Sequence, residues 1–244
     1  MLVSVWKSDQ EIQHDLAGIQ NVALFSCNVC ANLNGTGGRR GLRRMKKLLQ
    51  QWGKTTVVAK TVNFCCSEEI LRQKFRVYLD PVRDRCQALV MLSCAGGVKC
   101  AFMYSAGLPV VAALDSIGSG VVATSMEPGQ AGLCVTCHHC VLTHTGGICP
   151  LAACPAKRKY GPCKKAPAEG DLCALDPERK CVWKEIEARG DMEALARLSR
   201  IHADQDYHRP APVKAPGKPV VVRRFSGWFM ARLPGLSDLV DLVK

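Results

Sequence analysis

The fold of this chain is decided by residues 22–62, which read VALFSCNVCANLNGTGGRRGLRRMKKLLQQWGKTTVVAKTV. The apolar run at residues 22–26 has the length of a buried strand. Residues 41–52 then place apolar side chains at helical spacing, with arginines and lysines between them. A second strand-like run follows at residues 55–62. This stretch therefore predicts strand, helix and strand in that order.

The same alternation continues beyond this stretch. A helix is expected at residues 67–79, a strand at 88–93 and a further strand at 109–114. Strands that alternate with helices form a parallel sheet, because the crossover connections are right-handed. We therefore expect an α/β fold, with a small parallel-sheet domain of Rossmann or flavodoxin type over residues 1–125.

The chain has 15 cysteines among 244 residues, which is more than an ordinary enzyme of this size carries. Disulfides or bound metal are the two chemical explanations. The N-terminal residues 1–16 show neither a basic region nor an apolar core typical of a secretory signal, so disulfides are disfavoured. No apolar run reaches the ~20 residues of a membrane span. The expectation is a cytoplasmic protein without membrane contact that uses its cysteines for metal.

The formal charge of +12 raises nucleic acid as a partner. That count treats every cysteine as neutral, whereas metal-bound cysteines are thiolates, so the basic excess is overstated. Aromatic residues make up only 6%, and no basic stripe carries interleaved aromatic side chains on which bases stack. No nucleic-acid partner is expected.

Cysteines follow the ends of three of the predicted strands. Cys27 and Cys30 follow the first strand, Cys65 and Cys66 the second, and Cys94 the third. Parallel strands end at one edge of the sheet, which is where such folds bind their ligands. Four thiolates at that edge suit either zinc or a 4Fe-4S cluster. The alternative is that they are ordinary buried cysteines.

A second group of cysteines fills residues 126–187, where glycine and proline recur and little regular structure is expected. We call this segment the cassette. Its eight cysteines are Cys134, Cys137, Cys140, Cys149, Cys154, Cys163, Cys173 and Cys181. Three cysteines at three-residue steps and a later Cys-Pro match ferredoxin-type ligation in part, because eight residues and not three precede the Cys-Pro. Eight cysteines suffice for two 4Fe-4S clusters. A pair of zinc ribbons is the alternative.

The remaining residues, 188–244, are expected to form a short helix, a proline-rich spacer and an apolar tail. The spacer lies at residues 209–219, and Phe225, Trp228 and Phe229 follow it. Such an end docks on a partner subunit, folds back on the chain's own core, or lies in a membrane interface. Docking on a partner is the favoured interpretation.

Two stretches of the cassette resemble a known family. Residues 133–163 read LCVTCHHCVLTHTGGICPLAACPAKRKYGPC, and residues 172–183 read LCALDPERKCVW. Both are similar to the methylenetetrahydrofolate reductase C-terminal domain family, which includes the small subunit of the reductase of acetogens and other anaerobes. The likeness is looser over residues 22–116 and ends near Glu187. Lys164 and Lys165 stand where the family has a glycine pair.

The resemblance implies an iron-sulfur subunit that relays electrons to or from the flavin of a separate reductase catalytic subunit, and that is itself non-catalytic. It also favours Cys66 over Cys65 at the sheet edge. Cys65, Cys86 and Cys100 are then not ligands. The implied ligands are Cys27, Cys30, Cys66 and Cys94 for a third 4Fe-4S cluster or zinc, and the eight cassette cysteines for two 4Fe-4S clusters.

The chain is too short to add the eightfold barrel of a folate reductase to these parts, so catalysis on folate is expected in another chain. The electron donor stays open between ferredoxin, a pyridine-nucleotide-oxidising subunit and a heterodisulfide-reductase-like complex. The alternative function is a zinc-stabilised scaffold or binding module within a multi-subunit complex.

Overall fold

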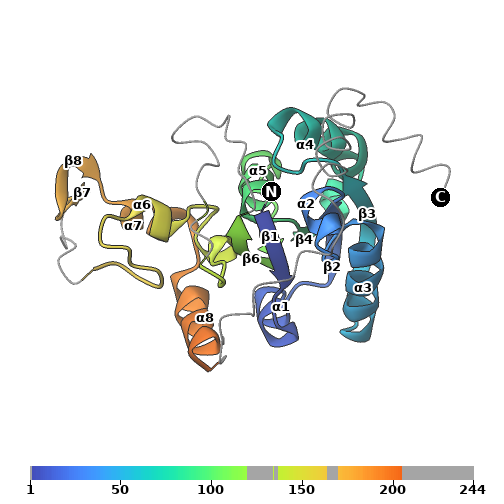
Figure 1. Ribbon diagram of the computed structural model, residues 1–244, viewed down its shortest axis with the longest axis horizontal. Coiled ribbons are helices and arrows are strands. Elements are labelled where there is room, and N and C mark those ends of the chain that lie inside the picture. Colours follow the sequence, from blue (N-terminus) through green and yellow to red (C-terminus); the bar gives the residue numbers. More distant parts are fainter. Residues whose placement is uncertain (1, 120–133, 135–136, 164–169, 205–244) are drawn as a thin grey trace. The chain divides into compact units, whose positions relative to one another are not determined.

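The computed structural model describes residues 2–119, 134, 137–163 and 170–204 (Figure 1). The chain up to Asp204 forms one compact unit. The predicted domain boundary at residue 125 and the predicted tail beyond residue 204 lie outside the described residues, and both stay predictions.

The elements before the cassette alternate strands and helices, with two irregular helical turns after α4. In chain order they are β1 (Leu2–Trp6), α1 (Asp9–Asp15), β2 (Asn21–Cys27), α2 (Cys30–Leu33), α3 (Gly38–Gln51), β3 (Thr55–Val62), α4 (Glu68–Lys74), the π-helix η1 (Phe75–Leu79), the 3-10 helix η2 (Asp80–Arg85), β4 (Ala88–Leu92), α5 (Ala95–Tyr104), β5 (Val110–Ala112) and β6 (Leu114–Ser119).

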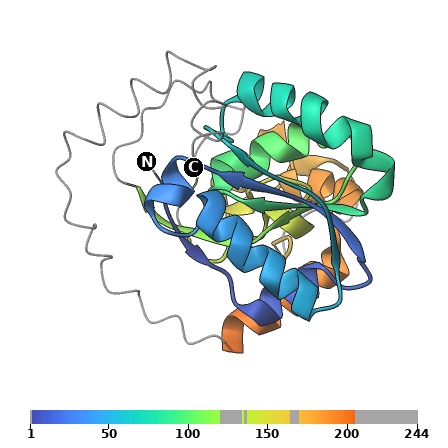
Figure 2. The ribbon, with the colours of Figure 1, turned by 90° about the vertical axis from the view of Figure 1, so that its right-hand side faces the viewer.

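The central sheet has four strands in the order β3-β2-β4-β5, and every pair in it is parallel. Strand β1 pairs antiparallel with β6 in a separate two-stranded sheet. From β2 the chain moves to β3 on one side of β2, and then crosses back to β4 on the other side and on to β5. The strand order therefore reverses between β2 and β4. Right-handed crossovers then place α3 on one face, and α4 and α5 on the other (Figure 2).

The sheet is the core of this part of the chain. Every residue of β4 is buried, and Phe25 of β2 meets Phe75 edge-to-face with ring centroids 5.1 Å apart. Helix α3 buries Met45 and Leu49 on its inner side while its arginines and lysines stay exposed. The apolar stripe at helical spacing is thus what holds α3 against the sheet.

Short elements follow in the cassette. These are η3 (Leu142–His144), α6 (Pro150–Ala153), and the antiparallel pair β7 (Leu172–Cys173) and β8 (Asp176–Lys180). Helices α7 (Val182–Arg189) and α8 (Met192–Asp204) close the described chain, and Leu195 and Leu198 of α8 are fully buried. None of the helices among the described residues has the length and apolar character needed to cross a membrane.

The expected α/β class and parallel sheet are confirmed, and β3 has the predicted bounds. Two predicted elements were wrong in detail. The helix expected at residues 67–79 is α-helical only to Lys74 and continues as η1. The strand expected at 109–114 ends at Ala112, because Ala113 passes the chain into β6. Strand β1 and helices α1 and α5 were not predicted.

Candidate functional site

Strand register brings the first cysteines to one edge. Cys27, the last residue of β2, pairs with Val62 at the end of β3, and Ser26 pairs with Leu92 at the end of β4. The loops that leave β3 and β4 therefore begin level with Cys27. This edge lies at the carboxyl end of the strands, beside the position where the order of the sheet reverses, and ligands of open parallel sheets bind there.

Cys27 lies in a ring of hydrogen-bond donors. The thiol of Cys65 donates to it, as do the backbone N–H groups of Cys65, Val29 and Ala31. These bonds outweigh burial and lower the pKa of Cys27 to about 6. The structure thus favours a thiolate at the end of β2, which is the form that ligates metal.

Burial and the negative charge of Cys27 raise the pKa of other thiols at this edge. Burial raises the pKa of Cys94 to about 12, and repulsion from Cys27, Cys66 and Cys30 adds to it. Burial likewise raises the pKa of Cys66 to about 11, again with repulsion from Cys27 and Cys30. The predicted set Cys27, Cys30, Cys66 and Cys94 is therefore brought together, with the extra Cys65 beside it.

Cys65 and Cys66 face different surroundings. The Cys65 thiol is fully buried, 3.8 Å from the carbonyl of Val62. Cys66 is half-buried. A methyl group added at Gly96 would lie 3.3 Å from the Cβ of Cys66 and 3.9 Å from the sulfur of Cys94. The absence of a side chain at Gly96 leaves room between Cys66 and Cys94. Cys66 borders that space, whereas Cys65 packs in the core.

A pocket gathers four cassette cysteines. Its lining includes Cys134, Cys137, Cys140 and Cys149. Apolar groups form most of the remaining wall, and the side chains of Lys99, His138 and Lys159 add nitrogen-bearing groups. The three-residue steps and the later Cys-Pro thus converge on one cavity. Ala95, the first residue of α5, also lines it, directly after Cys94 of the sheet-edge group.

Cys140 is held by a buried ionic network. Asp115 of β6 accepts the backbone N–H of Cys140 at 2.7 Å, and the Nζ of Lys7 donates to the Cys140 carbonyl at 2.8 Å. Lys7 also pairs with Asp115 at 3.1 Å and with Glu11 of α1. We call Lys7, Glu11 and Asp115 the Lys7 network. The backbone N–H and carbonyl of Cys140, a candidate ligand, are thus both held by charged side chains, those of Asp115 and Lys7.

Burial and charge pull in opposite directions in the Lys7 network. The side chains of all three residues have no exposed surface. Burial acts against the ammonium of Lys7, but Asp115 and then Glu11 outweigh it and hold the pKa of Lys7 above its usual value. Burial also opposes the carboxylate of Glu11, yet Lys7, together with a hydrogen bond from His202, lowers the pKa of Glu11 to about 2.

The network continues to the last described helix. His202 of α8 lies 3.1 Å from Glu11 through Nε2, and its Nδ1 is hydrogen-bonded to the Tyr160 hydroxyl at 2.7 Å. The ring of His139 lies against that of His202, with centroids 4.4 Å apart. Helix α8 is therefore connected both to α1 and to the cassette. No pattern in the sequence identified these contacts, because they join residues 42 or more positions apart.

A third group contains the later cysteines. Cys154, Cys173 and Cys181 are buried in one apolar cluster with Trp183, Ile186, Leu195 and Leu198. The Nε1 of Trp183 is buried and has no hydrogen-bond partner among the described residues. Cys163, the fourth predicted member, is half-buried and does not belong to that cluster. Helix α6 connects this group to the pocket, with Cys149 before its first residue and Cys154 after its last.

Cys86 and Cys100 belong neither to the lining of the pocket nor to the third group. The thiol of Cys86 contacts the carbonyl of Val82 at 3.3 Å. Cys100 is buried on α5, and burial, with repulsion from Cys66 and Glu68, raises its pKa to about 12. Their prediction as non-ligands is consistent with these positions but stays a prediction.

Comparison with known proteins gives one match. No curated protein and no solved structure matches the chain. The matching family model is described as methylene-tetrahydrofolate reductase C terminal, and it covers residues 111–208. It extends past Glu187, where the resemblance was expected to end, and includes α8, whose Leu195 and Leu198 pack beside the third cysteine group. Residues 111–208 thus match the methylene-tetrahydrofolate reductase C-terminal family, as the cassette motifs predicted.

Proposed function

We propose that this chain is an electron-transfer subunit of a methylenetetrahydrofolate reductase, with iron-sulfur clusters held by its three cysteine groups. The observation that carries the proposal is the pocket that brings Cys134, Cys137, Cys140 and Cys149 together inside the family-matched segment. Iron-sulfur clusters supply one-electron transfer over a wide range of potentials. The proposed partner is the flavin-bearing catalytic subunit that the family name suggests.

Each cysteine group offers features that suit an anionic cluster. The sheet edge presents N–H donors around Cys27 and room at Gly96. The pocket has Lys99 and Lys159 in its wall. The third group has the indole N–H of Trp183, which has no partner in the described part of the chain, and hydrogen bonds to cluster sulfurs are a recognised means of setting potential. Donor set and surroundings therefore fit the group.

The groups are arranged in series along the chain's own elements. Cys94 belongs to the sheet-edge group and the next residue, Ala95, lines the pocket, so the first turn of α5 separates those two groups. The pocket and the third group are separated by α6, with Cys149 before its first residue and Cys154 after its last; its four helical residues span about 6 Å. We propose the pocket as the middle station of a three-centre relay.

The metal content of anaerobically purified protein tests this proposal. We expect about eight irons with matching acid-labile sulfide for the cassette, and about twelve if the sheet edge also holds a cubane. Reduction should give the electron paramagnetic resonance signal of reduced clusters, and the reduced chain should transfer electrons to the flavin of its partner. Zinc throughout, without iron, would instead establish the alternative scaffold function.

The tail is the proposed means of attachment to a partner, although residues 205–244 lie outside the described residues. Deleting residues 223–244 should leave iron content and cluster spectra unchanged and weaken co-purification with the flavin-bearing chain. Several hundred Å2 of apolar surface is worth on the order of 10 kcal/mol before ordering costs. Loss of clusters after the deletion would show that the tail belongs to this chain's own core.

A further inference from the structure

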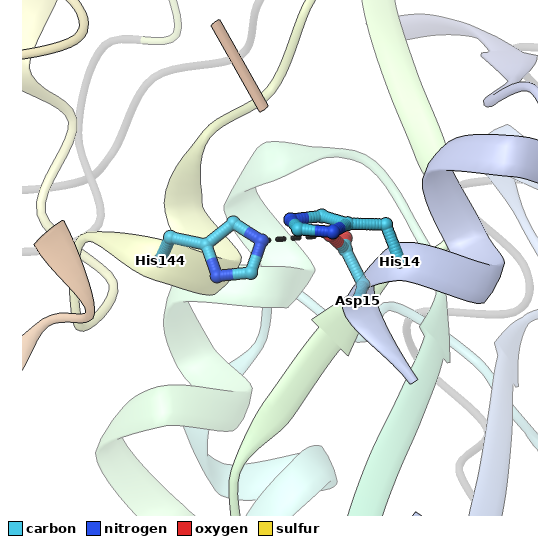
Figure 3. A group of neighbouring side chains, drawn as sticks. All are labelled: His14, Asp15 and His144. Atoms are coloured by element: carbon cyan, nitrogen blue, oxygen red, sulfur yellow. Dashed lines mark hydrogen bonds and ion pairs between the residues drawn. The ribbon is translucent and has the colours of Figure 1, made fainter. Parts of the chain in front are cut away.

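A group of nitrogen and oxygen ligands lies apart from the cysteine groups. His14 and Asp15 end α1, and His144 ends η3, 129 positions further along the chain. One ligand atom from each of the three lies within 4.8 Å of the other two (Figure 3). Asp15 and His144 are buried and His14 is half-buried. The three side chains thus point into one small space between two elements.

An ion pair accounts for only part of this arrangement. The Nε2 of His144 lies 2.7 Å from the Oδ1 of Asp15. The other carboxylate oxygen, Oδ2, is buried and has no hydrogen-bond partner among the described residues. Leaving a buried carboxylate oxygen without a partner is unfavourable, so Asp15 offers an unfilled bonding position. Its side chain is 1% exposed, which leaves little access for bulk water.

His14 supplies the third ligand and is not engaged in the ion pair. Its ring lies 5.4 Å from that of His144, between centroids, and is tilted by 57°. Its Nε2 lies 3.3 Å from the carbonyl of Ala194 at the start of α8. That contact is long for a hydrogen bond, so turning the ring toward Asp15 sacrifices little.

We propose that His14, Asp15 and His144 bind one divalent first-row transition ion. Two imidazoles and a carboxylate suit Zn²⁺ or Fe²⁺, with bonds of about 2.0–2.2 Å for zinc. The ion takes the place of the hydrogen between His144 and Asp15, and Oδ2 gains a partner. Thiolates are softer ligands, so this nitrogen–oxygen site is chemically distinct from the cysteine groups.

The role of this ion is to join the cassette to the sheet domain. The ion would link Asp15 to His144 across the intervening chain, and its ligands come from α1 and η3. The backbone carbonyl of His144 also accepts the N–H of Asp191, at the start of α8, at 3.0 Å. Helix α8, which contacts α1 through His202 and Glu11, is therefore also joined to η3 beside the proposed ion. The ion is structural in this proposal, and no electron passes through it.

Cobalt binding to the full-length, cluster-loaded chain tests the site, because Co²⁺ reports its ligands. Bound by nitrogen and oxygen it shows only visible d–d bands, whereas bound by thiolate it adds strong near-ultraviolet charge transfer. We expect one equivalent with d–d bands alone. His14→Gln should weaken its affinity at least about tenfold, whereas Asp84→Asn, at an exposed carboxylate on η2, should leave it unchanged.

His14→Gln is the decisive variant because it removes a ligand while leaving the Asp15–His144 pair intact, so its fold is retained. Zn²⁺ should raise the Tm of the wild-type chain and not that of His14→Gln. Three outcomes would overturn the proposal: equal cobalt bands in the wild-type chain and His14→Gln, thiolate charge transfer as the only response, or no equivalent of cobalt bound. Each would leave the three residues as an ion pair with a neighbouring histidine.

Discussion

The sheet-edge group and the cassette place their cysteines by different means. At the sheet edge, strand pairing carries Cys27 and Cys94 to one side of a core in which every residue of β4 is buried. In the cassette, the four cysteines of the pocket stand outside helices and strands, and the backbone of Cys140 is held by Lys7, directly after β1, and by Asp115 of β6. The sheet-edge group is pre-organised by the fold, while the pocket depends on charge pairs and, in the proposed function, on bound metal.

The largest expected difference between the two regions appears on removal of metal. The backbone hydrogen bonds of the cassette belong to turns, one-turn helices and one short strand pair, so without the proposed metal amide exchange in residues 137–181 should accelerate by orders of magnitude. Amides of β2 and β4 should stay protected, because their core contains no proposed ligand other than Cys27. Hydrogen exchange of holo and anaerobically chelated protein measures both. Equal loss of protection in β4 would show that the sheet also depends on metal.

Replacing single cysteines at the sheet edge with serine tests how strictly that site is pre-organised. Cys66→Ser should lose the metal of one centre, since Cys66 borders the space at Gly96. Cys65→Ser should keep that metal, because Cys65 lies in the core and acts only as a donor to Cys27. Metal analysis and cluster spectra of the two variants compare them directly. The opposite result would make Cys65 the ligand.

Lys7→Met tests whether charge pairs position the cassette. It leaves Asp115 and Glu11 buried without their cation, which typically costs about 3–5 kcal/mol, and it frees the carbonyl of Cys140. Denaturant unfolding of the holo protein should show the loss, with iron lost from the pocket before the sheet edge. Lys47→Met, on the exposed side of α3, is the matched control and should stay within about 0.5 kcal/mol. An equal effect of both variants would contradict the positioning role.

The two regions also differ in how far the sequence predicted them. Alternating apolar runs predicted the sheet, because strand and helix periods are local properties of the chain, and the cysteines after each strand predicted the edge group. The spacing of Cys134, Cys137 and Cys140 indicated a shared site, which the pocket is consistent with. The division of the cassette into two groups about α6, and the contacts of Lys7 with Cys140, join distant residues and leave no periodic signal.

The smallest expected effect is that of Trp183→Phe, which removes one N–H from the third cysteine group. In the holo protein, that N–H is proposed to face cluster sulfur, so its loss should lower the reduction potential of one cassette centre without loss of iron. In the apo protein, the same N–H is buried with no partner among residues 2–119, 134, 137–163 and 170–204, so its removal should be neutral or stabilising. Redox titration followed by electron paramagnetic resonance, together with unfolding of both forms, measures the two effects. Trp52→Phe, at the end of α3, should shift no potential. An unchanged potential in Trp183→Phe, or destabilisation of the apo protein, would show that the indole only fills the core and that the third group is tuned, like the sheet edge, by backbone donors.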